Sequence, residues 1–172
     1  MKNTQPEKDS RTLLLIRHAK SSWTDDSVND FERTLNDRGK RDAPVMAKRL
    51  LDKGVDIDTF VSSPARRARK TASLFAAQYG IDENDIIFKT ELYAAPQSVF
   101  SEVISSLDKS ARHIAIFSHN PGITEFANSL TPTRIDDMPT CSIFAIKLTL
   151  NDWNDFQDAK KEFWFFDYPK SV

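Results

Sequence analysis

Short apolar runs alternate along the chain with longer stretches in which apolar side chains recur at helical spacing. The runs at 12–16, 59–62, 86–88 and 113–118 have the length and continuity of strands buried on both faces. Between them, the apolar spacing of 37–53, 64–79, 96–107 and 122–130 predicts helices. Residues 142–148 and 163–166 predict two closing strands that pair as a hairpin.

Local signals mark several ends of these elements. Gly54 and Gly80 follow the first two helical stretches, as expected of C-terminal stops. Ser63 has the side chain of an N-cap, and Pro64 suits the first helical position. Residues 19–36 and 131–141 are irregular and polar, which indicates loops over a site.

Strands that alternate with helices favour an α/β fold, namely a three-layer α/β/α sandwich with a mainly parallel central sheet. The chain has 172 residues, and one domain commonly takes about 100–200 residues. We expect a flexible N-terminal tail at 1–10 and a single domain at 11–172.

Composition narrows the class of protein. The formal net charge of −1 argues against a nucleic-acid or membrane protein held by bulk electrostatics. The single cysteine, Cys141, cannot form an internal disulfide, and no Cys/His spacing indicates zinc. The polar N-terminus lacks an apolar signal core, and no apolar run is long enough for a membrane helix. The expectation is a cytoplasmic protein.

Polar side chains with phosphate chemistry follow the predicted strands. The first strand leads into Arg17-His18, the second into a basic run from Arg66 to Lys70, the third toward Glu91, and the fourth into His119. Ligands of open α/β sheets bind beyond the carboxyl ends of the strands. Arginine forks fit phosphate oxygens, and a neutral histidine can act as a nucleophile. Taken alone, however, the basic run is typical of a solvated helix face, and either histidine could be structural.

Three motifs in this order resemble the histidine phosphatase superfamily, which has the phosphoglycerate mutase-like fold. They are LIRHAKS at 15–21, SSPARRARKTA at 62–72 and SHN at 118–120, with weaker matches at 33–39 and 138–141. Within the superfamily the chain is most similar to the short SixA-type phosphohistidine phosphatases. No G-x-x-x-x-G-K-[ST] loop is present, and four glycines leave no dinucleotide-binding turn.

The resemblance implies roles for individual residues. His18 would be the phosphorylated nucleophile, Arg17 and Arg67 phosphate ligands, and His119 the second catalytic histidine. The motif alignment selects Arg67 rather than Arg66. We also expect phosphate contacts from a second set of polar residues: Lys20, Ser21 and Asn120. Ala19 and Asn120 stand where many relatives have glycine.

The position of the general acid is the weakest part of the match. Glu91 lies near the place where many relatives carry a glutamate proton donor, but its surroundings match poorly. A leaving imidazole needs less protonation than an alkoxide, so a doubtful acid favours phosphohistidine as the substrate.

These observations lead to one function and two alternatives. The first is a metal-independent phosphatase, without a cofactor, that removes phosphate from phosphohistidine in a partner protein and releases inorganic phosphate. The alternatives are a phosphatase of a small phosphate ester and a non-catalytic phosphate-binding module. Mutase chemistry fits poorly, because residues 21–36, with Trp23, Phe31 and Arg33, supply only a partial cover over the site.

Overall fold

The computed structural model describes residues 9–23 and 27–171 of the chain. One six-stranded sheet runs through it in the order β3-β2-β4-β1-β5-β6. Strands β1 (Ser10–Arg17), β2 (Thr59–Ser62), β3 (Ile87–Phe88) and β4 (His113–Ser118) are parallel. Strands β5 (Ile143–Thr149) and β6 (Lys160–Asp167) form the antiparallel edge. The predicted mainly parallel sheet and closing hairpin are confirmed.

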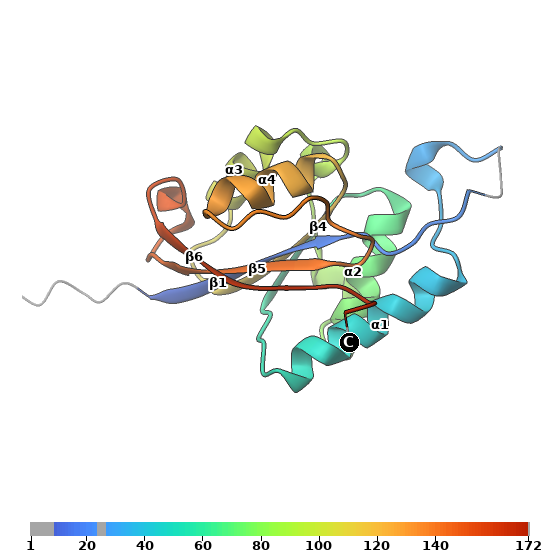
Figure 1. The fold of residues 1–172 in the computed structure, drawn as a ribbon, viewed down its shortest axis with the longest axis horizontal. Coiled ribbons are helices and arrows are strands. Elements are labelled where there is room, and N and C mark those ends of the chain that lie inside the picture. The colour runs from blue at the N-terminus through green and yellow to red at the C-terminus, as the bar shows by residue number, and fades with distance from the viewer. Residues whose placement is uncertain (1–8, 24–26, 172) are drawn as a thin grey trace, which may run out of the picture.

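Helices cover both faces of the sheet (Figure 1). Helices α1 (Asp37–Asp52) and α2 (Arg66–Gln78) pack together on one face, and α3 (Gln97–Ser105) and α4 (Gly122–Leu130) on the other. Short 3-10 turns η1 (Asp30–Glu32), η2 (Glu83–Asp85), η3 (Thr90–Leu92) and η4 (Trp153–Asp155) lie in the connections. The three-layer sandwich expected from the sequence is therefore the observed architecture.

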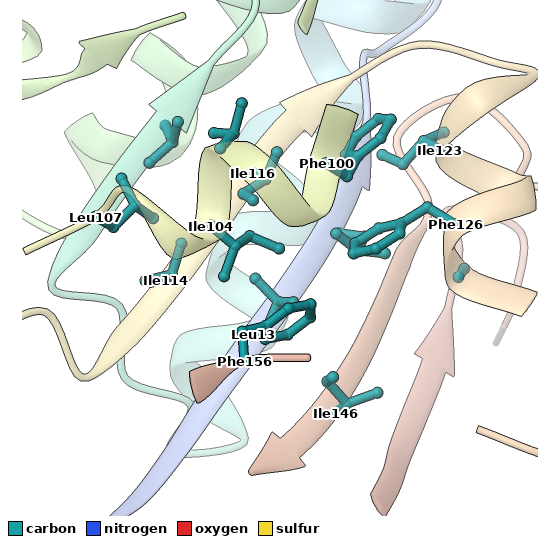
Figure 2. Packing of buried hydrophobic residues seen from close by; sticks show 14 of the residues in the cluster. Leu13, Phe100, Ile104, Leu107, Ile114, Ile116, Ile123, Phe126, Ile146 and Phe156 are labelled. Atoms are coloured by element: carbon teal, nitrogen blue, oxygen red, sulfur yellow. The ribbon is translucent and has the colours of Figure 1, made fainter. Parts of the chain in front are cut away.

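Two apolar cores lie on opposite faces of the sheet because successive strand side chains point in opposite directions. In β1, Leu13 and Leu15 enter the core beneath α3 and α4, whereas Leu14 and Ile16 enter the core beneath α1 and α2. Figure 2 shows the first core, where Phe100 of α3 stacks on Phe126 of α4 with ring centroids 5.0 Å apart. Both faces of β1 are thus buried, as its continuous apolar run predicts.

Several element boundaries differ from the expectations. Ser10, expected in the tail, begins β1, and the tail residues 1–8 lie outside the described residues. Helix α2 begins at Arg66 with Ala65 as its N-cap, so Ser63 and Pro64 precede the helix. The Ser63 hydroxyl oxygen still accepts a hydrogen bond from the Ala65 N–H at 3.2 Å. Ser63 therefore shapes the turn into α2 without capping it.

The strand register brings the predicted site residues together. Arg17 at the end of β1 pairs with Ser118 at the end of β4, and Ser62 at the end of β2 pairs with Phe117. Beyond this edge the backbone N–H of His18 donates to the carbonyl of Ser118 at 3.1 Å. The residues that follow β1 and β4, among them His18 and His119, therefore lie next to each other. No helix in the described part of the chain has the length and apolar character needed to cross a membrane.

Candidate active site

A cavity of about 310 Å³ lies at the carboxyl edge of the parallel strands. The residues that line it include seven expected from the sequence: Arg17, His18, Lys20, Ser21, Arg67, His119 and Asn120. Six further lining residues come from the loops around the mouth: Trp23, Asp30, Arg33, Tyr93, Ala94 and Thr140. The structure therefore brings together residues from six separate segments of the sequence.

Hydrogen bonds fix the tautomer of His18, whose side chain is buried. Its Nδ1 lies 2.8 Å from the carbonyl oxygen of Ala19, so Nδ1 carries the proton and donates it to that oxygen. The other ring nitrogen, Nε2, accepts a hydrogen bond from the Nε–H of Arg67 at 3.3 Å. Nε2 therefore keeps its lone pair and faces a fixed cation, which is the arrangement a histidine nucleophile requires.

Helix α2 holds both Arg67 and the backbone beside His18. The Thr71 hydroxyl accepts a hydrogen bond from the Ala19 N–H at 3.0 Å and donates to the carbonyl of Arg67 at 2.7 Å. Arg67 is 5% exposed, whereas its neighbour Arg66 is exposed on the outer face of the helix. The helical rotation between the two residues is what separates the cavity residue from the surface residue.

His119 lies beside His18, with ring centroids 5.2 Å apart. Its Nε2 is 2.8 Å from the hydroxyl of Ser63, while its Nδ1 is buried without a hydrogen-bond partner. Arg17 donates from Nη1 to the carbonyl of Met138 at 2.8 Å, and its Nε is likewise buried without a partner. A tetrahedral oxyanion offers an acceptor of the kind that the unpaired N–H of Arg17 needs.

Burial lowers the pKa of both histidines. Desolvation, together with the positive charge of Arg67, lowers the pKa of His119 to about 3. Desolvation also lowers the pKa of His18 well below 6.5, against a raising effect of the bond to Ala19. Both imidazoles are therefore neutral at neutral pH, so the Nε2 of His18 is not protonated.

This shift predicts a pH-dependent loss of stability. Histidine in the unfolded chain has a pKa of about 6.5, so below that pH the unfolded state binds more protons than the folded state. His119 then lowers the unfolding free energy by about 1.4 kcal/mol per pH unit as the pH falls from 6.5 toward its folded pKa. Chemical denaturation of wild type and His119→Asn between pH 7 and 5 measures this effect, and wild type should lose more stability. Parallel pH profiles for the two proteins would contradict it.

One carboxylate, that of Asp30, joins the cations of the cavity. Arg67 donates from Nη1 to the carbonyl of Asp30 at 2.6 Å and from Nη2 to its carboxylate at 3.1 Å. Arg33 donates to the same carboxylate at 3.1 and 3.2 Å, and the Tyr93 hydroxyl donates to it at 2.7 Å. Desolvation would raise the pKa of Asp30, but the bond from Tyr93 and the charge of Arg67 lower it to about 2. Asp30 is therefore ionised at neutral pH.

Arg33 and Trp23 border the mouth of the cavity. The guanidinium of Arg33 lies 3.6 Å from the ring centroid of Trp23, and its Nη1 donates to the hydroxyl of Ser21 at 2.5 Å. Both residues belong to the segment expected as a partial cover. Ser21 is thus engaged with Arg33, while Lys20 lines the cavity and its carbonyl accepts the N–H of Asn36 at 3.0 Å.

Asn120 and Cys141 hold the loops behind the cavity. The Asn120 amide donates to the carboxylate of Asp137 at 2.7 Å and to the carbonyl of Met138 at 3.0 Å. The N–H of Cys141 reaches the carbonyls of Arg17 and His18, each at 3.1 Å. Cys141 is buried and has a positive φ of 61°. The segment 138–141 thus supports the backbone on which Arg17 and His18 sit.

Glu91 does not lie in the cavity. It is exposed on the turn η3, where the next residue, Leu92, enters the core and the one after, Tyr93, faces the cavity. In this 3-10 turn Leu92 faces the core, so the preceding side chain, that of Glu91, points to solvent. Sequence reasoning placed Glu91 correctly near the strand end but could not determine which residue of the turn points inward, and it missed Asp30 and Tyr93 for the same reason.

Comparison with known proteins assigns the family. The profile of the histidine phosphatase superfamily (branch 1) matches residues 13–93. An uncharacterized chloroplastic protein of Arabidopsis thaliana is 32% identical over 157 residues, covering 85% of this chain and 70% of that protein. Serine/threonine-protein phosphatase Pgam5 of Drosophila melanogaster is 26% identical over 101 residues, which cover 51% of this chain but only 34% of that protein.

Solved structures agree with this assignment. SixA of Agrobacterium tumefaciens superposes with a TM-score of 0.75 at 23% identity, covering 92% of this chain and 99% of that one. The protein histidine phosphatase SixA complexed with tungstate gives a TM-score of 0.76 at 20% identity, covering 92% of this chain and 97% of that one. The chain therefore belongs to the histidine phosphatase superfamily and has the fold of its SixA-type phosphatases.

Proposed function

We propose that this phosphatase removes phosphate from phosphohistidine in a partner protein, through a covalent intermediate on Nε2 of His18. The observation that carries the proposal is the state of that ring. Its Nδ1 proton is bound by the carbonyl of Ala19, and its Nε2 lone pair lies beside the Arg67 guanidinium. A phosphate-binding module has no need for a neutral, tautomerically fixed imidazole at this position.

The chemistry proceeds in two displacements. In the first, the lone pair of His18 Nε2 attacks phosphorus and the bond from phosphorus to the substrate imidazole nitrogen breaks. That nitrogen keeps the electron pair and takes a proton from solvent. In the second, water attacks phosphorus and loses a proton to solvent, and His18 leaves as a neutral imidazole with inorganic phosphate as the product. Arg17 and Arg67 neutralise the charge on the equatorial oxygens, and the neutral ring of His119 helps to orient them, which is the main requirement for phosphoryl transfer.

The charges of the cavity favour a leaving group that needs little protonation. Among the described residues that line it, the carboxyl group is that of Asp30, which is ionised at neutral pH and cannot supply a proton. The Tyr93 hydroxyl donates to Asp30, and this bond raises the pKa of Tyr93 above its usual value. An alkoxide leaving group depends on an acid, whereas imidazole does not depend on one to the same extent.

Two further observations support the proposal. SixA binds tungstate, a tetrahedral oxyanion like phosphate, on the same fold. No group of three or more His, Cys, Asp or Glu side chains within the described ranges is arranged to hold a metal ion. We therefore propose a reaction that uses arginine side chains where other phosphatases use metal ions. Asn120 lines the cavity, and its bonds to the Asp137 carboxylate and the Met138 carbonyl support a role in positioning this loop.

Substrate selection tests this proposal. We expect kcat/KM for a phosphohistidine peptide to exceed that for alkyl phosphates of similar size, and Glu91→Gln to leave both values within about twofold, because an exposed side chain outside the cavity should contribute little. Parallel phosphate-release assays on both substrates measure this. A preference for unactivated alkyl phosphates that Glu91→Gln abolishes would instead identify a small-ester phosphatase.

Asp30 competes with the substrate for Arg67 in the arrangement observed. Asp30→Asn should therefore strengthen inorganic phosphate binding by roughly fivefold, since an ion pair to a half-exposed carboxylate is worth about 1 kcal/mol or less. Titration calorimetry with phosphate measures the change. Glu125→Gln, which removes an exposed charge from α4, serves as the matched control and should leave the affinity unchanged. Weaker binding to Asp30→Asn would show that Asp30 positions the arginines rather than competing with phosphate.

A further inference from the structure

A second and larger hollow adjoins the phosphate cavity. It has a volume of about 840 Å³ and lies between the start of α1, the outer face of α2 and strand β3. Its lining includes Thr34 and Arg66, whose sequence neighbours Arg33 and Arg67 line the phosphate cavity. Consecutive residues therefore form the wall between the two hollows. We call the larger one the basic groove.

Four cations give the basic groove its charge. They are Lys40, Arg66, Arg69 and Lys70, and all four are exposed. Unlike Arg33 and Arg67, none of them forms an ion pair or hydrogen bond through its side chain in the described part of the chain. Glu83, the acidic residue of the lining, accepts a hydrogen bond from the Ser73 hydroxyl at 2.9 Å. In a chain whose net charge is −1, this is a local excess of positive charge.

The far wall of the basic groove is apolar. Leu74 and Ile86 line it, and Phe88 is 42% exposed there. Phe88 belongs to β3, which is the edge strand of the sheet. An edge strand can bind an extended peptide through its backbone, while neighbouring pockets select the side chains. The groove thus combines a cationic wall, an apolar wall and a sheet edge.

We propose that the basic groove binds an acidic segment of the phosphorylated partner protein, with one apolar side chain of that segment against Phe88. This inference rests on the proposed function. The phosphate cavity, at about 310 Å³, has room for the phosphorylated side chain but not for its flanking residues. The flanking residues must therefore lie outside the cavity, across its rim. On the side of the shared wall, that path brings them next to the unpaired cations of the basic groove.

Charge complementarity identifies the occupant. Unpaired cations beside a site attract an acidic partner and orient it before docking. The apolar wall and the carboxylate of Glu83 suit a polypeptide segment better than the uniformly charged backbone of a nucleic acid. The groove therefore sets substrate preference through charge and one apolar contact, and it takes no part in phosphoryl transfer.

Two synthetic phosphohistidine peptides test the inference in the full-length chain. One peptide has glutamates and a leucine on its flanks, and the other has lysines in place of the glutamates. We expect kcat/KM to favour the acidic peptide by about tenfold, and the preference to weaken at high salt because screening acts on exposed charges. The double substitution Arg69→Glu with Lys70→Glu should remove the preference and leave turnover of phosphoramidate, a small substrate, unchanged. Lys109→Glu with Lys160→Glu, two exposed sites elsewhere, should change neither rate.

A binding measurement separates this inference from the proposed function. The acidic peptide without phosphate, carrying a fluorescent label, should bind wild type about tenfold more tightly than the Arg69→Glu, Lys70→Glu variant. Equal binding to both proteins, or equal kcat/KM for the two phosphopeptides, would overturn the groove inference. Tighter binding of a single-stranded oligonucleotide than of the peptide would also overturn it. Failure to hydrolyse any phosphohistidine substrate, with peptide binding intact, would overturn the proposed function alone.

Discussion

His18→Ala should abolish the phosphoenzyme and lower kcat/KM for phosphohistidine by roughly 10⁴-fold or more, the scale on which loss of a covalent nucleophile acts. The variant keeps Arg17, Arg67 and His119 and therefore still binds phosphate. It lacks the lone pair at Nε2, however, and none of the other described side chains that line the cavity accepts a hydrogen bond from the guanidinium of Arg67 through a nitrogen. Single-turnover assays with radiolabelled phosphohistidine peptide measure both the intermediate and the rate.

Retained phosphate binding is the control for this prediction. Calorimetry should show that His18→Ala binds inorganic phosphate within about tenfold of wild type, since the arginines supply most of the charge in the cavity. Thermal unfolding should show an intact fold. If His18→Ala still forms a phosphoenzyme, with the label on His119 for example, the assignment of the nucleophile is wrong.

Arg67→Ala should lower kcat/KM for phosphoramidate by about 10²–10³-fold, the usual cost of removing one donor aimed at the charge of the transition state. Arg67 contacts the nucleophile itself at 3.3 Å and is 5% exposed, so its charge acts in a poorly solvated site. Arg66→Ala is a matched control, because it removes the same side chain one residue earlier on the exposed face. It should change phosphoramidate turnover by less than about twofold.

Arg67→Lys separates charge from geometry. Lysine retains the positive charge but lacks the planar fork, so it cannot contact a phosphate oxygen and His18 Nε2 in the same way. We expect this variant to bind phosphate better than Arg67→Ala yet to remain at least about tenfold slower than wild type. Equal rates for Arg66→Ala and Arg67→Ala would show that the buried guanidinium has no special role.

Most of the fold could be predicted from the sequence because the apolar pattern of each segment agrees with the burial that the segment has in the folded protein. The run Leu13–Ile16 reads as a strand buried on both faces, and each of its side chains lies in one of the two cores. The least accurate predictions concern element ends. The position of Ser63 and Pro64 before α2 illustrates this, because capping preferences do not distinguish a cap from the turn that precedes it.

Part of the candidate site could also be predicted. His18 and His119 follow adjacent parallel strands, so the topology alone brings them together, and the motif selected Arg67 over the neighbouring Arg66. Asp30 and Tyr93 could not be predicted in the same way. They come from irregular segments and 3-10 turns, where side-chain direction depends on tertiary packing rather than on a repeating pattern. The same reason explains why Glu91 points to solvent.

The most direct test of this account is to identify the phosphorylated atom. Wild-type protein is mixed with labelled phosphohistidine peptide, quenched in alkali within milliseconds, digested and mapped by mass spectrometry and phosphorus NMR. The account predicts acid-labile phosphate on Nε2 of His18, formed and lost at rates compatible with turnover. Phosphate on Nδ1 or on another residue, or turnover with no phosphoenzyme at any time, would contradict it.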